Sequence, residues 1–267
     1  MKPLGLLVLA AAACLCPADL FATGKGVAPE FSLTLKDLQS MTTSLPKAIQ
    51  RDIAAKPEAF LHLLAAVLSE PPELLVLVDK KHPLPADSVP VDLVSLNDYP
   101  LNVSRPDLRL RKAIMPGVLA MDAAARADGA PLLYSSAWRS YQYQATVYEN
   151  EVKSYGREQA DRESARPGMS QHQLGTAIDF GSITDAFAAT RQGKWLQAHA
   201  WEYGFSLSYP DGYEPVTGYR HESWHYRYVT KAGAILQRDF FGGIQQYMLE
   251  FLHDNRAVLE SRLVKKR

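Results

Sequence analysis

The pattern of apolar and polar positions divides the chain into two parts with different expected structures. From about residue 31 to residue 78, apolar residues recur at helical spacing between prolines, which predicts three or four short helices. Residues 80–101 contain many prolines and turn residues and indicate an irregular connector. We see no candidate chemistry in this first part, so the function has to be sought after it.

After the connector, the pattern predicts helices mixed with short strands. The expected helices span residues 114–126, 141–155 and 194–203. The expected strands span residues 131–136, 176–180, 205–209 and 224–229. An apolar stripe at helical spacing, from residue 244 to residue 263, predicts a C-terminal helix that packs by that face. Because helices and strands do not alternate regularly, we predict an α+β fold with a small antiparallel sheet flanked by helices.

The first 22 residues predict a signal peptide and therefore export. A lysine precedes an apolar run that is too short to span a bilayer, and small residues follow at Ala18 and Ala22. The alternative is a buried N-terminal helix, but the segment is apolar on every face and stands at the start of the chain. Both cysteines, Cys14 and Cys16, lie in it, so we expect no disulfide in the mature protein. A lipid anchor at Cys14 is less favoured, because Ala11 stands where a larger aliphatic residue is usual.

The charge balance excludes two classes of partner. The chain has 29 lysines and arginines against 29 aspartates and glutamates, so its formal net charge is zero. Such a chain offers no electrostatic footprint for nucleic acid or for an anionic membrane surface. We also expect no transmembrane span, and the sequence does not address the oligomeric state.

Three of the seven histidines, His172, His221 and His225, stand in contexts that suggest a metal site. His172 lies in an expected turn before Gly175, and Asp179 follows within an expected strand, so an imidazole and a carboxylate could lie side by side. His225 could complete the site. Two histidines and one aspartate with an open fourth position form a catalytic type of zinc site, whereas closed structural sites use four protein ligands. From these residues alone, a capped turn with a solvated Asp179 remains the alternative.

Three motifs in this region together resemble the VanY-like D-alanyl-D-alanine carboxypeptidase family. This family of zinc peptidases is related to lysostaphin-type and hedgehog-type domains. The motifs follow one another in the order and at the spacing typical of the family, between about residues 79 and 240. The matching residues are Ser136, Ala137, Trp138, Arg139, Ser140 and Gln144, then Ser170, His172, Gly175, Ala177 and Asp179, then Glu222, Trp224 and His225.

The resemblance implies a role for each matching polar residue. His172, Asp179 and His225 would bind one Zn²⁺ per chain. Glu222 would be the general base that takes a proton from the attacking water and passes it to the leaving amine, and Arg139 would stabilise the oxyanion. Hydrogen bonds to the substrate backbone or to its terminal carboxylate would come from Gln144, Ser170 and Ser136.

A ligand pair formed by His221 and His225 is a competing assignment, because residues four apart share a strand face or a helix face. Glu222 would then lose its role as a base. In the favoured assignment, Glu222 and His225 are three residues apart, so an ideal strand would point them to opposite faces. A bulge or turn must therefore lie between them. We also expect residues 208–220 to form a loop over the site.

The resulting prediction has three segments: a signal peptide at 1–22, an N-terminal helical region at 23–78, and a zinc D-Ala-D-Ala carboxypeptidase-like domain at 79–267. The implied protein is exported to the periplasm, the cell envelope or the medium, and removes the C-terminal D-alanine from peptidoglycan stem peptides. An L,D-carboxypeptidase, a D,D-dipeptidase or a stem-peptide endopeptidase would use the same metal centre. A non-catalytic zinc-containing wall-binding module is the remaining alternative, but such a module needs neither Glu222 nor Arg139.

Overall fold

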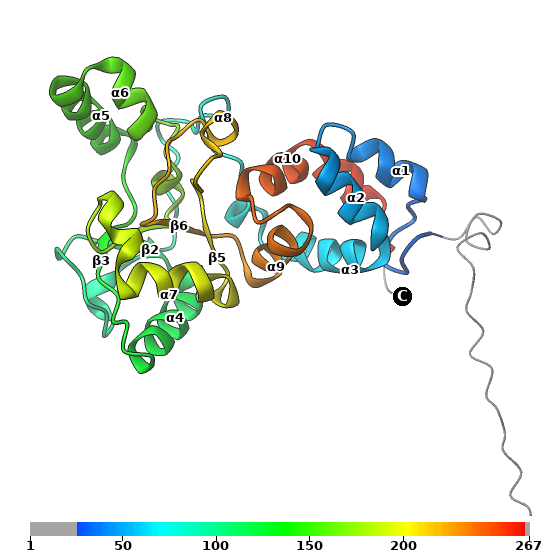
Figure 1. Cartoon of the computed structure of the whole chain (residues 1–267), viewed down its shortest axis with the longest axis horizontal. Helices are drawn as coiled ribbons and strands as arrows, with labels where there is room; N and C mark the ends of the chain where they lie inside the picture. The colour runs from blue at the N-terminus through cyan, green and yellow to red at the C-terminus, as the bar shows by residue number, and fades with distance from the viewer. Residues whose placement is uncertain (1–25, 265–267) are drawn as a thin grey trace, which may run out of the picture.

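The computed structural model describes residues 26–264 of the chain. The predicted signal peptide, both cysteines and the alternative lipid anchor lie outside the described residues, so they remain predictions. Across residues 26–264, none of the helices combines the length and the apolar character needed to cross a bilayer. Figure 1 shows an elongated molecule with a helical part at one end and a part containing the sheet at the other.

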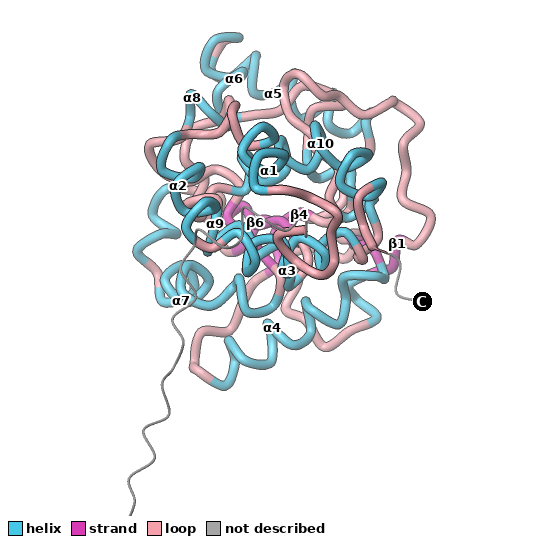
Figure 2. Tube along the Cα trace, turned by 90° about the vertical axis from the view of Figure 1, so that its right-hand side faces the viewer, coloured by secondary structure: helices cyan, strands magenta, loops and turns pink. Residues whose placement is uncertain are grey.

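The helical part is built from both ends of the described chain. Its N-terminal helices are α1 (Leu35–Met41), α2 (Lys47–Ala55) and α3 (Pro57–Leu68), and its C-terminal helices are α9 (Lys231–Phe240) and α10 (Gln245–Ser261). Thr34 and Asp37 form a capping box that begins α1, and Pro57 occupies the first turn of α3. In the end-on view of Figure 2, these helices lie in front of strands β4 and β6.

One hydrophobic core joins the helices from the two ends. Phe60 of α3 is fully buried, and its ring lies 5.3 Å from that of Phe240 in α9 and 5.8 Å from that of Phe251 in α10. The same cluster contains residues of α1 and α2 as well as Leu259 near the end of α10. The first helices therefore bury their apolar faces against the C-terminal helices.

A second core surrounds a four-stranded antiparallel sheet. Its strands are β3 (Tyr134–Ser136), β4 (Ala177–Phe180), β5 (Phe205–Leu207) and β6 (His225–Tyr228), in the spatial order β3-β4-β6-β5. In the register between β4 and β6, Asp179 lies opposite His225, and Ala177 lies opposite Arg227. The class predicted from the sequence, α+β with a small antiparallel sheet and flanking helices, is confirmed.

The remaining elements surround this sheet or lead into it. The helices are α4 (Met115–Ala127), α5 (Tyr141–Tyr155), α6 (Arg157–Glu163), α7 (Arg191–His199) and α8 (Glu214–Thr217), and a separate antiparallel pair is formed by β1 (Leu93–Ser95) and β2 (Arg109–Arg111). Short 3-10 helices span Pro72–Leu74, Leu96–Asp98, Lys112–Ile114, Gln171–Leu174, Asp185–Ala189 and Ala200–Tyr203.

Several elements differ from the expected ones. The expected helix at 194–203 is α7 followed by a 3-10 turn, and Gly204 ends it with a φ of +87° that suits glycine. The connector contributes β1, and the expected loop at 208–220 contains the short helix α8. The pattern also gave no sign of α6 or α9. The two helices have only seven and ten residues, so each offers few apolar positions from which a helical period can be recognised.

Arg227 connects the sheet to the segment that follows α3. Its side chain is fully buried, and its Nη2 donates to the carbonyl oxygens of Leu74 and Val76 at 3.2 and 2.7 Å. Burial lowers the pKa of Arg227 to about 10, so the guanidinium stays charged at neutral pH. A buried cation thus fastens the two parts of the molecule to each other.

The shared helical core generates a stability prediction. Phe60→Ala should lower the free energy of unfolding by about 3–5 kcal/mol, because it removes a fully buried ring and leaves a cavity among aromatic neighbours. Denaturant unfolding measures the change. Val258→Ala, at a half-exposed position of α10, should change stability by no more than about 0.5 kcal/mol. Equal effects of the two variants would contradict the proposed importance of this core.

Candidate metal centre

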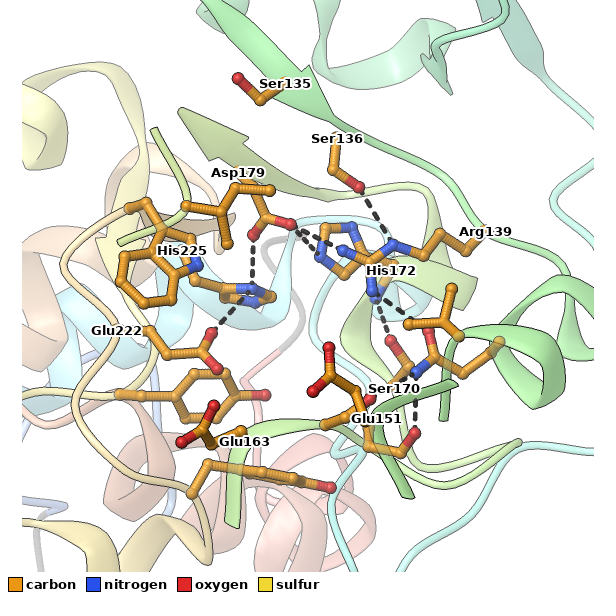
Figure 3. Close-up of a pocket in the computed structure, with 18 of the residues that line it drawn as sticks. Ser135, Ser136, Arg139, Glu151, Glu163, Ser170, His172, Asp179, Glu222 and His225 are labelled. Carbon is orange, nitrogen blue, oxygen red and sulfur yellow. Dashed lines mark hydrogen bonds and ion pairs between the residues drawn. The ribbon is translucent and has the colours of Figure 1, made fainter. Parts of the chain in front are cut away.

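Three of the predicted site residues converge at one end of the sheet. His172, Asp179 and His225 are all buried, and each offers a ligand atom within 4.8 Å of those of the other two. His172 Nε2 lies 3.1 Å from Asp179 Oδ2, and His225 Nδ1 lies 2.9 Å from Asp179 Oδ1. Figure 3 shows the carboxylate of Asp179 between the two rings. Within residues 26–264, the grouping that could hold a metal contains these three and not His221.

A tight turn carries His172 to the start of strand β4. Ser170 caps the 3-10 helix by accepting a hydrogen bond from the backbone N–H of His172 at 3.3 Å. Gly175 ends the turn with a φ of +69°, and a Cβ on it would lie only 3.0 Å from Arg111 Cγ. His172 Nδ1 lies 2.6 Å from the carbonyl oxygen of Ala137, to which it can only donate. The lone pair of Nε2 therefore faces Asp179.

In His225 the hydrogen lies on Nε2, whereas in His172 it lies on Nδ1. His225 Nε2 lies 3.2 Å from Gln171 Oε1, an acceptor, so this nitrogen carries the hydrogen. Nδ1 is then the atom whose lone pair faces the carboxylate of Asp179. Two imidazole lone pairs thus point at a carboxylate, which is an arrangement of acceptors suited to a cation.

The charge states within the cluster agree with this interpretation. Burial lowers the pKa of His172 to about 4, with the Arg139 guanidinium acting in the same direction, so the ring is neutral at pH 7. Asp179 is also buried, and its Oδ2 accepts a hydrogen bond from the Arg139 guanidinium at 2.7 Å, which favours the ionised carboxylate. A neutral imidazole and an ionised carboxylate are the forms that bind metals.

Glu222 lies beside the cluster because the chain turns just before β6. The backbone N–H of His225 donates to the carbonyl oxygen of Glu222 at 3.2 Å, which closes a four-residue turn. This is the turn that the sequence required, and it brings both side chains into one cavity (Figure 3). Glu222 Oε2 lies 3.7 Å from His225 Nδ1. Burial, with a contribution from Asp179, raises the pKa of Glu222 well above its usual range.

Arg139 reaches the cluster from the loop between β3 and α5. Its Nη2 donates to Asp179 Oδ2 at 2.7 Å. Its Nε donates to Ser136 Oγ at 3.0 Å, and its Nη1 donates to Gln144 Oε1 at 3.2 Å. Two of the three residues predicted to bind substrate, Ser136 and Gln144, therefore hold the guanidinium. The third, Ser170, caps the turn that carries His172, and all three line the cavity.

The cavity in front of the cluster has a volume of about 550 Å³. Helix α5 forms one wall through residues that repeat every four positions, namely Tyr143, Val147, Glu151 and Tyr155. The expected covering loop contributes Tyr209, whose ring lies 4.8 Å from that of His225, and Tyr219. A cavity of about 550 Å³ is in the size range of sites that bind organic ligands rather than water alone.

The sequence motifs did not single out Glu151, Glu163 or Gln171. Figure 3 shows the carboxylates of Glu151 and Glu163 facing the cavity, and burial together with Glu163 raises the pKa of Glu151. The spacing along α5 was the available signal for Glu151. Gln171 stands directly before His172, inside the second motif, and this position was the only signal for it.

Comparisons with known sequences point to one family. A model of the family described as VanY, D-alanyl-D-alanine carboxypeptidase, matches residues 107–231. The putative carboxypeptidase YodJ of Bacillus subtilis (strain 168) is 34% identical over 187 residues, which cover 67% of this chain and 68% of that protein. A D-alanyl-D-alanine carboxypeptidase of Enterococcus faecium is 26% identical over 190 residues, which cover 69% of this chain and 60% of that protein. The match thus leaves two fifths of the enterococcal protein without a counterpart.

Solved structures give the same result at the level of the fold. The LD-carboxypeptidase LdcB is 34% identical, with a TM-score of 0.61 over 67% of this chain and 87% of that chain. A mutant of the vancomycin resistance D,D-pentapeptidase VanY, in complex with Zn(II), is 29% identical, with a TM-score of 0.56 over 67% of this chain and 99% of that chain. Sequence, fold and the geometry of the cluster agree, and the resemblance expected from the three motifs is confirmed. The chain belongs to the VanY family of D-alanyl-D-alanine carboxypeptidases.

Proposed function

We propose that this protein is a zinc-dependent carboxypeptidase that removes the C-terminal D-alanine from peptidoglycan stem peptides. The observation that carries the proposal is the cluster of His172, Asp179 and His225 at the end of an open cavity, with Glu222 and Arg139 beside it. A VanY-family relative has been solved in complex with Zn(II), and the family match supports a peptidase. One zinc ion per chain is the cofactor.

The donor atoms fit zinc. His172 Nε2 is buried and has no hydrogen-bond partner, although Asp179 Oδ2 lies 3.1 Å away, because both atoms are acceptors. Two imidazole nitrogens and a carboxylate oxygen are typical ligands of a catalytic zinc site. When bound, the ion supplies Lewis acidity, which lowers the pKa of water and polarises a carbonyl group.

We assign the proton transfers to Glu222. Its carboxylate is buried beside the cluster and faces the cavity in which a peptide bond would lie. It can accept a proton from the attacking water and return that proton to the leaving amine of D-alanine. Its low exposure keeps bulk water from competing for these transfers.

We assign oxyanion stabilisation to Arg139. Ser136 and Gln144 fix its guanidinium from two sides, so the charge is oriented before the substrate arrives. A permanent positive charge held in place is worth more in a buried site than in water. Ser136 and Gln144 therefore support the reaction through Arg139, and the cavity leaves room for Ser170 to contact the substrate.

The L,D-carboxypeptidase is the second candidate activity. The observation that favours it is the similarity to LdcB, described as an LD-carboxypeptidase, at 34% identity. Such an enzyme would remove the single D-alanine of a tetrapeptide instead of the last residue of a pentapeptide. In either case the substrate lies outside the cytoplasmic membrane, which accords with the signal peptide that we propose for residues 1–22.

The first prediction concerns the metal. His172→Ala should reduce the zinc content of the purified protein well below one ion per chain, because two remaining protein ligands hold zinc poorly. Elemental analysis measures this directly. His199→Ala changes an exposed histidine of α7 and should leave the zinc content unchanged. Full zinc content in the His172 variant would remove this residue from the ligand set.

The second prediction separates metal binding from proton transfer. Glu222→Gln should retain zinc but lower the turnover number by a factor of about 10²–10⁴, the usual contribution of a general base. The control is Glu214→Gln, which changes a glutamate of α8 that binds Arg162. Its turnover should stay near that of the unchanged protein. A Glu222 variant with undiminished turnover would refute the assignment of the base.

The third prediction addresses the bond that is cleaved. Purified muropeptides with pentapeptide stems and with tetrapeptide stems should be incubated separately with the protein. The masses of the products are then measured by mass spectrometry. We expect the pentapeptide to lose one alanine. Loss of alanine from the tetrapeptide alone would assign the L,D-activity. Release of D-Ala-D-Ala would assign a D,D-dipeptidase, and a cut inside the stem would assign an endopeptidase. No change in either substrate would favour a non-catalytic module.

A further inference from the structure

A chain of buried amides runs from the metal cluster to the start of helix α10. Gln171 Oε1 accepts from His225 Nε2 at 3.2 Å and from the hydroxyl group of Ser208 at 2.7 Å. Gln171 Nε2 donates to Gln245 Oε1 at 3.3 Å, and Gln245 Nε2 donates to the carbonyl oxygen of Ser206 at 3.3 Å. The three side chains of Gln171, Ser208 and Gln245 are 1–3% exposed. Their hydrogen bonds therefore form without competition from water.

The direction of these hydrogen bonds is fixed at one end by the backbone. The carbonyl oxygen of Ser206 can only accept, so the amide nitrogen of Gln245 must face it. Gln245 Oε1 then faces Gln171, which must present its own nitrogen there and its oxygen to His225. His225 consequently carries its hydrogen on Nε2 and directs the lone pair of Nδ1 toward Asp179. A main-chain carbonyl of β5 thus sets the tautomer of a metal ligand three hydrogen bonds away.

Gln245 lies outside the part of the chain that the family model matches, which ends at residue 231. It is the first residue of α10, whose apolar face belongs to the core that α1, α2 and α3 share. The helical part of the molecule is therefore connected to the metal cluster by specific hydrogen bonds as well as by the chain itself.

We propose that Gln171 and Gln245 are positioning residues that hold the His225 ring in the orientation and tautomer needed to bind zinc. This inference rests on the proposed function only through the zinc site. Neither residue touches the substrate in this role, since Gln171 acts through His225 and Gln245 acts through Gln171. Partners of this kind usually change metal affinity by about 10–100-fold when they are removed.

The experiment measures zinc affinity in the full-length protein by competition with a chromogenic chelator. Gln171→Leu should weaken zinc binding by about 10–100-fold, because an apolar side chain of similar length leaves the ring without its acceptor. Gln245→Leu should weaken it in the same direction by up to about tenfold, because Gln171 can then turn its amide. Gln171→Glu should restore most of the affinity, since a carboxylate oxygen still accepts from His225 Nε2.

The matched control is Gln246→Leu. Gln246 is the next residue of α10 and is also buried, but its amide donates to Asp79 Oδ2 at 2.8 Å and to Glu250 Oε1 at 3.0 Å. We expect it to leave zinc affinity unchanged even if it lowers stability. Substitution with Co²⁺ supplies a second measurement, because its visible spectrum reports the ligand geometry, and it should change in Gln171→Leu and Gln245→Leu alone.

Three outcomes would overturn the proposal. Wild-type zinc affinity in both Gln171→Leu and Gln245→Leu would show that the amides do not position the ring. An equal loss in Gln246→Leu would show a general effect of destabilising α10. Absence of zinc binding by the unchanged protein would remove the site itself. Because none of these measurements uses a substrate, a failure to cleave muropeptides would count against the proposed function alone.

Discussion

The antiparallel pairing of β4 with β6 is the constraint on which the rest of this structure depends. Its register sets Asp179 opposite His225, so two residues 46 positions apart in the sequence become neighbours. A slip of one residue would turn every side chain of one strand to the other face of the sheet and disperse the cluster. Arg227 lies two residues beyond His225 on the same face, and its buried guanidinium is held by backbone carbonyls that follow α3. The residue that fastens the two parts together thus also resists such a slip.

Electrostatics explains why the cluster must bind or pair with a cation. Asp179 is a buried anion, and each imidazole presents a lone pair to it while its other nitrogen is committed to Ala137 or Gln171. Desolvating a carboxylate is costly unless positive charge compensates it. Arg139 supplies part of that charge through Asp179 Oδ2, and a divalent ion among the three donors supplies the remainder. The same guanidinium therefore stabilises the ligand and faces the cavity.

The sequence predicted those parts of the fold and site whose residues lie in contiguous motifs. It predicted less well the parts that depend on packing between distant segments. The turn that carries His172 to Gly175 and the helix α5 could be predicted, because a turn glycine and helical spacing are local signals. The need for a turn between Glu222 and His225 also followed from strand geometry alone. By contrast, α9 packs against α3 from the other end of the described chain, and Gln245 meets Gln171 across 74 residues. Such long-range contacts leave no trace in the spacing of residues along one segment. The division at residue 78 remains a prediction, although the first helices share their core with the last two.

Helix α5 has a further consequence for how enzymes of this architecture diversify. Only Gln144 and Tyr148 of its fifteen residues are buried, and its cavity-lining stripe faces open space rather than the interior. Substitutions along that stripe would reshape the entrance and its charge at little cost to folding, because surface changes seldom alter stability by much. The metal ligands stand on the sheet and on a capped turn and would be left undisturbed. The stripe that shapes this wall of the cavity and the residues that hold the metal cluster thus stand on different elements.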